Sequence, residues 1–128
     1  MTCVLDASAL LALLLGESRG ETVRAELPDA SISTVNLAEV VAHYARNGAT
    51  EDEIREILDP LPLDRIDFDT DLAVACGLMP PATRAAGLSL GDRACLALAK
   101  QLGVRAVTAD RAWSTVAEVI DVSVEILR

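Results

Sequence analysis

Residues 2–10 read Thr2-Cys3-Val4-Leu5-Asp6-Ala7-Ser8-Ala9-Leu10, and the architecture of the chain can be worked out from this segment. A short β-prone run meets an acidic residue and passes at once into a second apolar run. The first run predicts a strand over residues 2–5, and Ser8 is placed to cap a helix that reaches about Leu15. The segment therefore predicts one strand–helix unit of an α/β protein.

The same alternation continues along the chain. Further short strands are predicted over residues 30–33, 66–68, 104–108 and 122–127. Helices are predicted over residues 17–27, 34–47, 72–79 and 82–86, and after the capping boxes Thr50-x-x-Glu53 and Ser89-x-x-Asp92, with a turn or short helix over 111–113. Because such strands pair in parallel under helices on both faces, we expect one α/β domain over residues 1–128.

The composition describes an acidic chain that is rich in apolar residues. With 128 residues, 52% of them hydrophobic, it can bury a core without disulfides, and low-complexity disorder is excluded. The longest apolar run, residues 7–15, is shorter than the roughly 20 residues that span a bilayer, and it lacks the flanks of a signal peptide. Cys3, Cys76 and Cys95 lie far apart among apolar neighbours. We therefore expect buried thiols, no membrane association and a cytoplasmic location.

The charge balance restricts how this chain would bind nucleic acid. Its net charge is −9 at pH 7, whereas proteins that neutralise phosphates with their own side chains are basic. Aromatic residues make up only 2%, which leaves no stacking platform for single-stranded bases. A nucleic-acid partner would therefore need a bound cation or a basic partner protein to attract it.

Four acidic residues fall near the predicted ligand-binding edge of the sheet, at the carboxyl ends of its strands. Asp6 follows the first strand and Asp110 follows the strand over residues 104–108, while Glu39 and Asp92 lie in the first two turns of helices. Helix capping explains each acid taken alone: Asp6 and Asp110 as N-caps, and Glu39 and Asp92 in capping-box spacing with Asn36 and Ser89.

Taken together, the four acids suggest a metal site. Asp6 and Glu39 lie in apolar segments with no Lys or Arg within a helical turn, where an unpaired charge is costly. Convergent carboxylates raise one another's pKa, and a hard divalent cation such as Mg²⁺ or Mn²⁺ relieves that repulsion. Such a centre suits metal-assisted phosphodiester hydrolysis, and the cation would draw a polyanion to an acidic protein.

Four segments together resemble a PIN domain, and within that family the VapC-type ribonuclease toxins of bacterial toxin–antitoxin pairs. The segments are Leu5-Asp6-Ala7-Ser8-Ala9-Leu10, Ser33-Thr34-Val35-Asn36-Leu37-Ala38-Glu39-Val40, Leu88-Ser89-Leu90-Gly91-Asp92-Arg93-Ala94 and Thr108-Ala109-Asp110. The resemblance implies a three-layer α/β/α sandwich with a central parallel sheet and a Mg²⁺- or Mn²⁺-dependent endoribonuclease that a small cognate antitoxin inhibits. It also implies that Asp6, Glu39, Asp92 and Asp110 are the catalytic, metal-binding acids, with Ser8 and Thr108 in support. RNA is the expected substrate and a homodimer the expected assembly.

Two other classes of protein remain as alternatives. A catalytically inactive PIN-like binding module would keep the acids to dock a basic partner protein. A phospho-acceptor receiver domain is disfavoured, because Ala7 follows Asp6 where a receiver needs paired acids, and the only lysine, Lys100, is predicted within a helix.

Several other residues have both a structural and a functional interpretation. His43, the only histidine, could act as a general base, but the favoured interpretation is a surface or partly buried helix residue. Arg93 and Arg111 could bind phosphate, but the favoured interpretation is that they pair with surface carboxylates. Trp113 is expected in the core rather than in base stacking. The helical face formed by Ile54, Ile57 and Leu58 is assigned either to the core or to a protein interface.

Overall fold

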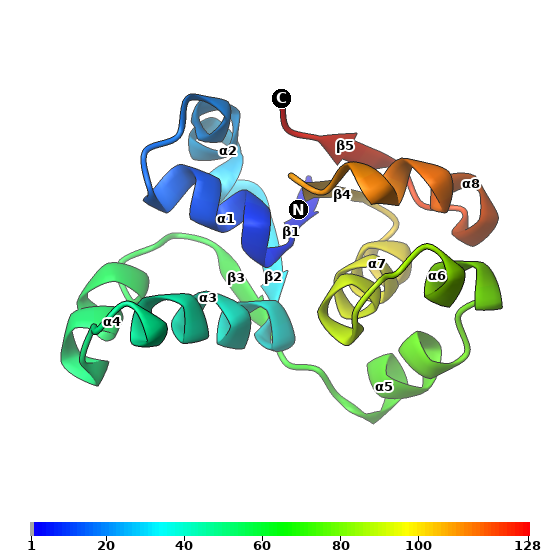
Figure 1. Ribbon diagram of the computed structural model, residues 1–128, viewed down its shortest axis with the longest axis horizontal. Coiled ribbons are helices and arrows are strands. Elements are labelled where there is room, and N and C mark those ends of the chain that lie inside the picture. Colours follow the sequence, from blue (N-terminus) through cyan, green and yellow to red (C-terminus); the bar gives the residue numbers. More distant parts are fainter. Residues whose placement is uncertain (1) are drawn as a thin grey trace.

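The computed structural model describes residues 2–128, and its strands pair in a five-stranded sheet (Figure 1). The strands are β1 (Cys3–Leu5), β2 (Ala30–Ser33), β3 (Asp64–Ile66), β4 (Arg105–Thr108) and β5 (Val124–Ile126). All four pairings are parallel, in the order β3-β2-β1-β4-β5. The prediction of a parallel α/β sheet is confirmed.

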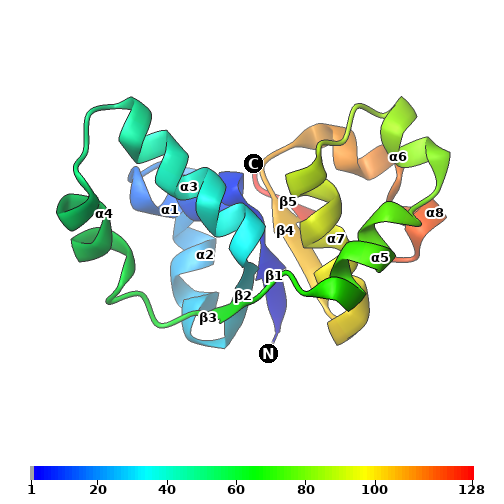
Figure 2. The same cartoon turned by 90° about the horizontal axis from the view of Figure 1, so that it is seen from below.

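Helices cover both faces of the sheet, as Figures 1 and 2 show. One face carries α1 (Ala7–Leu14), α2 (Glu21–Glu26), α3 (Thr34–Arg46) and α4 (Glu51–Leu58). The other carries α5 (Thr70–Gly77), α6 (Pro81–Ala85), α7 (Leu90–Leu102) and α8 (Ala117–Ile120). Short 3₁₀ turns complete the chain: η1 (Ser18–Gly20), η2 (Leu27–Asp29) and η3 (Arg111–Thr115). The expected α/β/α sandwich is therefore present.

The core has two halves because successive strand residues point to opposite faces of the sheet. On the face of α1 to α4, Leu5 packs with Leu10 and Ile32, while on the other face Val4 packs with Leu96. The central strand β1 is buried along its whole length, which explains why it reads as an uninterrupted apolar run.

The order of the strands determines where a ligand can bind. From β1 the chain moves outward to β2 and β3, and it then returns past β1 to build β4 and β5 on the opposite side. The direction of winding reverses between β1 and β4, and ligand sites of open α/β sheets lie at the carboxyl ends of strands at such a point. Asp6 follows β1 there, and Asp110 lies two residues beyond the end of β4.

Some predicted boundaries are wrong, and local hydrogen bonds show why. β3 spans Asp64–Ile66 rather than residues 66–68, so it both begins and ends two residues earlier than predicted. The Phe68 N–H donates to the Thr34 hydroxyl at 3.1 Å instead of to the sheet. The N-cap of α1 is Asp6 and not Ser8, whose hydroxyl donates to the Asp6 carboxylate. Asp69 caps α5, so that helix begins at Thr70, two residues earlier than predicted.

The continuous helix predicted over residues 17–27 is instead the sequence η1, α2 and the start of η2. Gly20 ends η1 pressed against α1, where an added Cβ would lie 2.4 Å from the Ala12 carbonyl oxygen. This close approach turns the chain before α2 starts. Helix α8 was not predicted at all, although its last residue, Ile120, and its N-cap, Val116, are both buried.

Two predictions about composition can be compared with the structure. The three cysteines are free and buried, as expected. Within residues 2–128, no helix is both long enough and apolar enough to cross a membrane.

Candidate functional site

The four acids predicted from the sequence lie around one pocket of about 280 Å³, which we call the acidic pocket. Asp6 and Asp110 reach it from the carboxyl edge of the sheet, Glu39 from the second turn of α3, and Asp92 from the first turn of α7. Its other lining residues are Ala7, Ser8, Leu11, His43 and Arg46. Parts of the chain up to about a hundred residues apart therefore converge at the point where the sheet reverses its winding.

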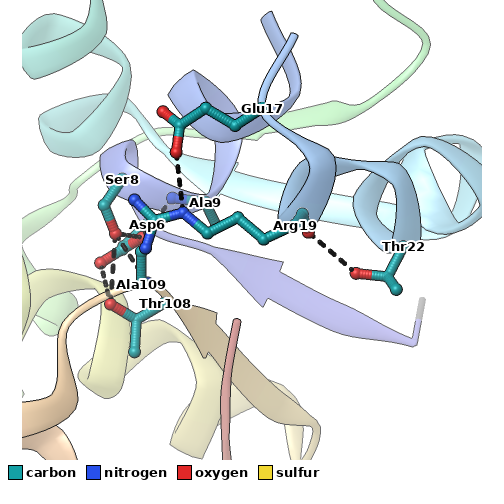
Figure 3. A network of polar contacts seen from close by, with 8 residues as sticks. All are labelled: Asp6, Ser8, Ala9, Glu17, Arg19, Thr22, Thr108 and Ala109. Carbon is teal, nitrogen blue, oxygen red and sulfur yellow. Dashed lines mark hydrogen bonds and ion pairs between the residues drawn. The ribbon is translucent and has the colours of Figure 1, made fainter. Parts of the chain in front are cut away.

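Asp6 is held at the base of the acidic pocket by three hydrogen bonds, and it is only 4% exposed. Its Oδ1 accepts from the Ser8 hydroxyl at 2.7 Å and from the Ala9 N–H at 2.8 Å. Its Oδ2 accepts from the Thr108 hydroxyl at 2.5 Å. Figure 3 shows the two hydroxyls pointing at the carboxylate from α1 and β4. The carboxylate therefore has little freedom to rotate.

The hydroxyl hydrogens of Ser8 and Thr108 are both committed to Asp6. A hydroxyl has a single hydrogen, so each oxygen can otherwise only accept. Ser8 Oγ accepts from the Ala109 N–H at 2.9 Å, and Thr108 Oγ1 accepts from the Asp110 N–H at 3.0 Å. The turn that carries Asp110 is therefore tied through Ser8 and Thr108 to Asp6. A carboxylate offers about four lone-pair sites, so the three bonds leave about one, on Oδ2, for a cation or water.

The environment of Asp6 opposes its negative charge. Burial is the largest cause, and together with the nearby charge of Asp92 it raises the pKa of Asp6 from 3.8 to about 6. The hydrogen bonds from Thr108, Ala9 and Ser8 act in the opposite direction, since they stabilise the ionised form. A cation at this position would favour the ionised form further.

Glu39 lies at the rim and is bound to a neighbour on its own helix. Asn36 is 1% exposed, and its Nδ2 donates to Glu39 Oε1 at 2.9 Å and to the Gly91 carbonyl oxygen at 3.0 Å. Partial burial, together with the charge of Asp92, raises the pKa of Glu39, although the Asn36 bond lowers it. The N-cap of α3 is Ser33, so Asn36 and Glu39 lie inside the helix and do not form a capping box.

The capping interpretation is confirmed for the other three acids: Asp6 is the N-cap of α1, Asp110 is the N-cap of η3, and Asp92 belongs to the capping box of α7. Asp92 Oδ2 accepts from the Ser89 N–H at 2.8 Å in a full capping box, and Asp110 Oδ1 accepts from the Ala112 N–H at 2.9 Å. Each of these two caps uses one carboxylate oxygen, so capping and metal binding do not compete for the same atoms. An acid at the start of a helix also benefits from the helix dipole.

The donor set of the acidic pocket suits a hard divalent cation, because all four acids offer carboxylate oxygens. Asp6, Asp92 and Asp110 would hold the ion, with Glu39 beside them. Among residues 2–128, however, no three His, Cys, Asp or Glu side chains are already arranged as a metal site. The pocket supplies the ligand chemistry without a preformed coordination sphere.

The structure also places the other residues singled out from the sequence. His43 is partly buried and lines the acidic pocket one helical turn beyond Glu39. Arg93 and Arg111 do not line the acidic pocket. Among the described residues neither forms an ion pair with a carboxylate, so the predicted surface ion pairs are wrong. Trp113 is fully buried in the core, as predicted.

Sequence reasoning missed one residue that lines the pocket and one that lies beside it, and it left the role of a separate helical face undecided. Arg46 reaches it from α3, and its spacing of seven residues from Glu39 places both on one helix face. Gly91 is the point where α7 meets Glu39, and no sequence signal identifies that contact. The face of Ile54, Ile57 and Leu58 belongs to the core, with Ile54 6% and Leu58 5% exposed.

The PIN domain family model matches residues 3–119, and the chain therefore belongs to this family. The match contains all four acids of the pocket. A comparison with curated proteins gives no match.

Solved structures of similar fold include several toxin–antitoxin proteins. DNA-bound VapBC from Salmonella typhimurium has a TM-score of 0.77 at 17% identity, covering 100% of this chain and 99% of that one. VapBC2 from Rickettsia felis, bound to a promoter DNA fragment, has a TM-score of 0.72 at 17% identity, covering 100% of both chains. VapBC-5 from Mycobacterium tuberculosis, a member of the VapBC family of toxin–antitoxin systems, has a TM-score of 0.61 at 23% identity, covering 100% and 99%.

Proposed function

We propose that this protein is a Mg²⁺- or Mn²⁺-dependent endoribonuclease and the VapC-type toxin of a toxin–antitoxin pair. The observation that carries the proposal is the convergence of four carboxylates, from four separate elements, on one pocket at the reversal point of the sheet. Membership of the PIN domain family and the likeness in fold to VapBC proteins support the same function.

Each acid has a proposed role. Asp6, Asp92 and Asp110 hold the metal, and Glu39 either holds the metal or orients the attacking water. When bound, the metal would activate water and stabilise the charge that develops on the phosphate. The chain's own contribution is to keep these acids in place: hydroxyl donors orient Asp6, and a capping box orients Asp92.

In this proposal, helix α3 contacts the RNA substrate. Glu39, His43 and Arg46 lie at i, i+4 and i+7 on that helix, and all three line the acidic pocket. Within residues 2–128 Arg46 has no ion-pair partner, so its guanidinium is available to an RNA phosphate beside the reacting one. This places a cation next to the acids in a protein of net charge −9.

The proposed partner is a short antitoxin that directs basic side chains toward the acidic pocket. The negative charge of the chain favours such a partner by electrostatic steering. Co-expression with the neighbouring reading frame should yield a complex with a small basic protein, and a protein that purifies alone would count against the pairing. A homodimer and a cytoplasmic location remain predictions.

The test measures metal binding and RNA cleavage in the parent and in Asp92→Asn. Asn retains an oxygen that can accept from Ser89, so the capping box and the fold should survive. We expect calorimetry to show Mn²⁺ binding by the parent that is lost in Asp92→Asn, and cleavage of a mixed RNA pool to be lost with it. The matched control is Glu53→Gln, which neutralises an acid in the capping box of α4, outside the pocket.

The alternative of a non-catalytic binding module predicts a different result. A module that docks a basic partner through the same acids would lose the partner in Asp92→Asn, and neither protein would cleave RNA. Cleavage by the parent that persists unchanged in Asp92→Asn would contradict the proposed catalytic role of these acids.

A further inference from the structure

The contact between Asn36, Glu39 and Gly91 costs the folded protein stability, so a contribution to stability does not explain why Asn occupies position 36. Both neighbours of the Asn36 amide, Glu39 Oε1 and the Gly91 carbonyl oxygen, are acceptors, so the amide must turn its NH₂ group toward them. Its own Oδ1 is then left buried without a hydrogen-bond partner. A buried unsatisfied acceptor costs stability, and an apolar residue here would avoid that cost.

The Glu39 carboxylate occupies the space that a side chain at position 91 would fill. A Cβ built on Gly91 would lie 2.5 Å from Glu39 Oε1 and 2.6 Å from Oε2, so that any side chain at this position would force the carboxylate to move. Residue 91 occupies the first turn of α7, immediately before Asp92. The absence of a side chain there allows α3 and α7 to approach closely, so that Glu39 and Asp92 line the same pocket.

We propose that Asn36 is a positioning residue that holds the Glu39 carboxylate against Gly91 and so fixes its place relative to Asp92. One NH₂ group bridges the two helices, since it donates to a side chain of α3 and to the backbone of α7. The bond occupies Oε1 and leaves Oε2 to a cation or to the attacking water. This role rests on the proposed ribonuclease function, in which Glu39 acts beside the metal.

Two variants disturb the same carboxylate by different means. Asn36→Ala removes the donor. Gly91→Ala keeps the donor but pushes the carboxylate away, and because the atoms displaced are the free end of a flexible side chain, the fold should tolerate it. Asn47→Ala is the matched control, since Asn47 lies at the end of the same helix and donates to the His43 carbonyl oxygen instead.

The first measurement needs neither metal nor RNA. The chain has two asparagines and one glutamine, so its NMR spectrum contains three pairs of side-chain amide signals. We expect the Asn36 pair to exchange slowly with water and to shift in Gly91→Ala, while the Asn47 pair stays in place. An Asn36 pair that exchanges freely in the parent would overturn the contact on which the proposal rests.

The second measurement is single-turnover cleavage of an RNA oligonucleotide selected from a pool that the parent cleaves. Asn36→Ala and Gly91→Ala should each lower the rate constant by about tenfold to a hundredfold, with RNA affinity within about twofold of the parent. In a Glu39→Gln background, both effects should shrink to less than about threefold, because the carboxylate they position is gone.

The outcomes separate this inference from the proposed function. A parent that cleaves no RNA contradicts the ribonuclease function itself. A parent that cleaves RNA, with Asn36→Ala at full rate or with an effect that persists in Glu39→Gln, overturns the positioning role and leaves the function standing.

Discussion

The Thr108 hydroxyl donates a 2.5 Å hydrogen bond to Asp6 Oδ2 and so joins the ends of β4 and β1 across 102 positions of sequence. Thr108 is fully buried and Asp6 nearly so. The same hydroxyl oxygen accepts from the Asp110 N–H, so one side chain sets the positions of two of the four acids.

Thr108→Val removes the hydroxyl with little change in shape. The Thr108 bond holds the pKa of Asp6 down against burial, so we expect that pKa to rise above about 6 in the variant. The unfolding free energy should fall by about 1–3 kcal/mol, because the Asp110 N–H loses its acceptor. NMR titration of the Asp6 carboxyl carbon and urea unfolding measure both effects.

The control for Thr108→Val is Thr115→Val, whose hydroxyl donates to the Ala112 carbonyl oxygen at an exposed position. It should leave the pKa of Asp6 unchanged. An unchanged Asp6 pKa in Thr108→Val itself would contradict the hydrogen bond as described.

Asp6→Asn should stabilise the protein at neutral pH while abolishing the proposed activity. The pKa of Asp6 is higher in the folded protein, about 6, than the ordinary value of 3.8 expected in the unfolded chain. Between these values the folded state binds more protons than the unfolded state, so this group's contribution to stability falls as pH rises from about 4 to about 6. The shift corresponds to roughly 3 kcal/mol at most, at 1.36 kcal/mol per unit.

Urea unfolding at pH 4, 5, 6 and 7 tests this prediction. The stability of Asp6→Asn relative to the parent should increase through the window and level off above pH 6. Asp71→Asn, at an exposed position of α5, serves as the control. A difference between Asp6→Asn and the parent that does not change with pH would show that burial of the Asp6 charge is not costly.

Arg46→Gln should weaken RNA binding through the loss of one phosphate contact. For single-stranded nucleic acid, each contact contributes about 0.7 to the slope of log affinity against log salt concentration, so the slope should decrease by about that amount. Fluorescence polarisation with a labelled RNA oligonucleotide measures it, in an Asp92→Asn background that prevents cleavage.

Lys100→Gln is the control for Arg46→Gln, because it removes the same charge from a residue that does not line the acidic pocket. Its salt dependence should equal that of the background. Equal slopes for Arg46→Gln and Lys100→Gln would indicate that Arg46 contributes only to the net charge.

The parallel sheet and the convergence of the four acids on one pocket could be predicted from the sequence, because both depend on local patterns. That these acids bind a metal stays a prediction. Buried parallel strands are continuous apolar runs, and an acid at the end of such a run lies at the carboxyl edge of the sheet. The capping boxes at Thr50 and Ser89 are formed as their spacing indicates. These features are set by residues within four positions of one another.

The missed features depend on contacts between distant segments. Gly91 meets Glu39 only because α3 packs beside α7, and Phe68 leaves the sheet only because Thr34 supplies an acceptor. Asn36 appears from its spacing to be part of a capping box, while its amide in fact bridges two helices. Local spacing predicts which residues lie on the same face or cap of an element, and the packing of distant elements determines which partners those residues contact.

Two glycines in helical segments should respond in opposite directions to substitution by alanine. A Cβ at Gly20 would lie 2.4 Å from the Ala12 carbonyl oxygen, and the backbone there cannot move without separating η1 from α1, so Gly20→Ala should lower the unfolding free energy by about 1–3 kcal/mol. Gly77, the last residue of α5, has open space around its Cβ position, and Gly77→Ala should raise stability by roughly 0.5–1 kcal/mol through helix propensity. Urea unfolding of both variants measures the contrast, and a tolerated Gly20→Ala would mean that η1 does not pack on α1 as closely as described.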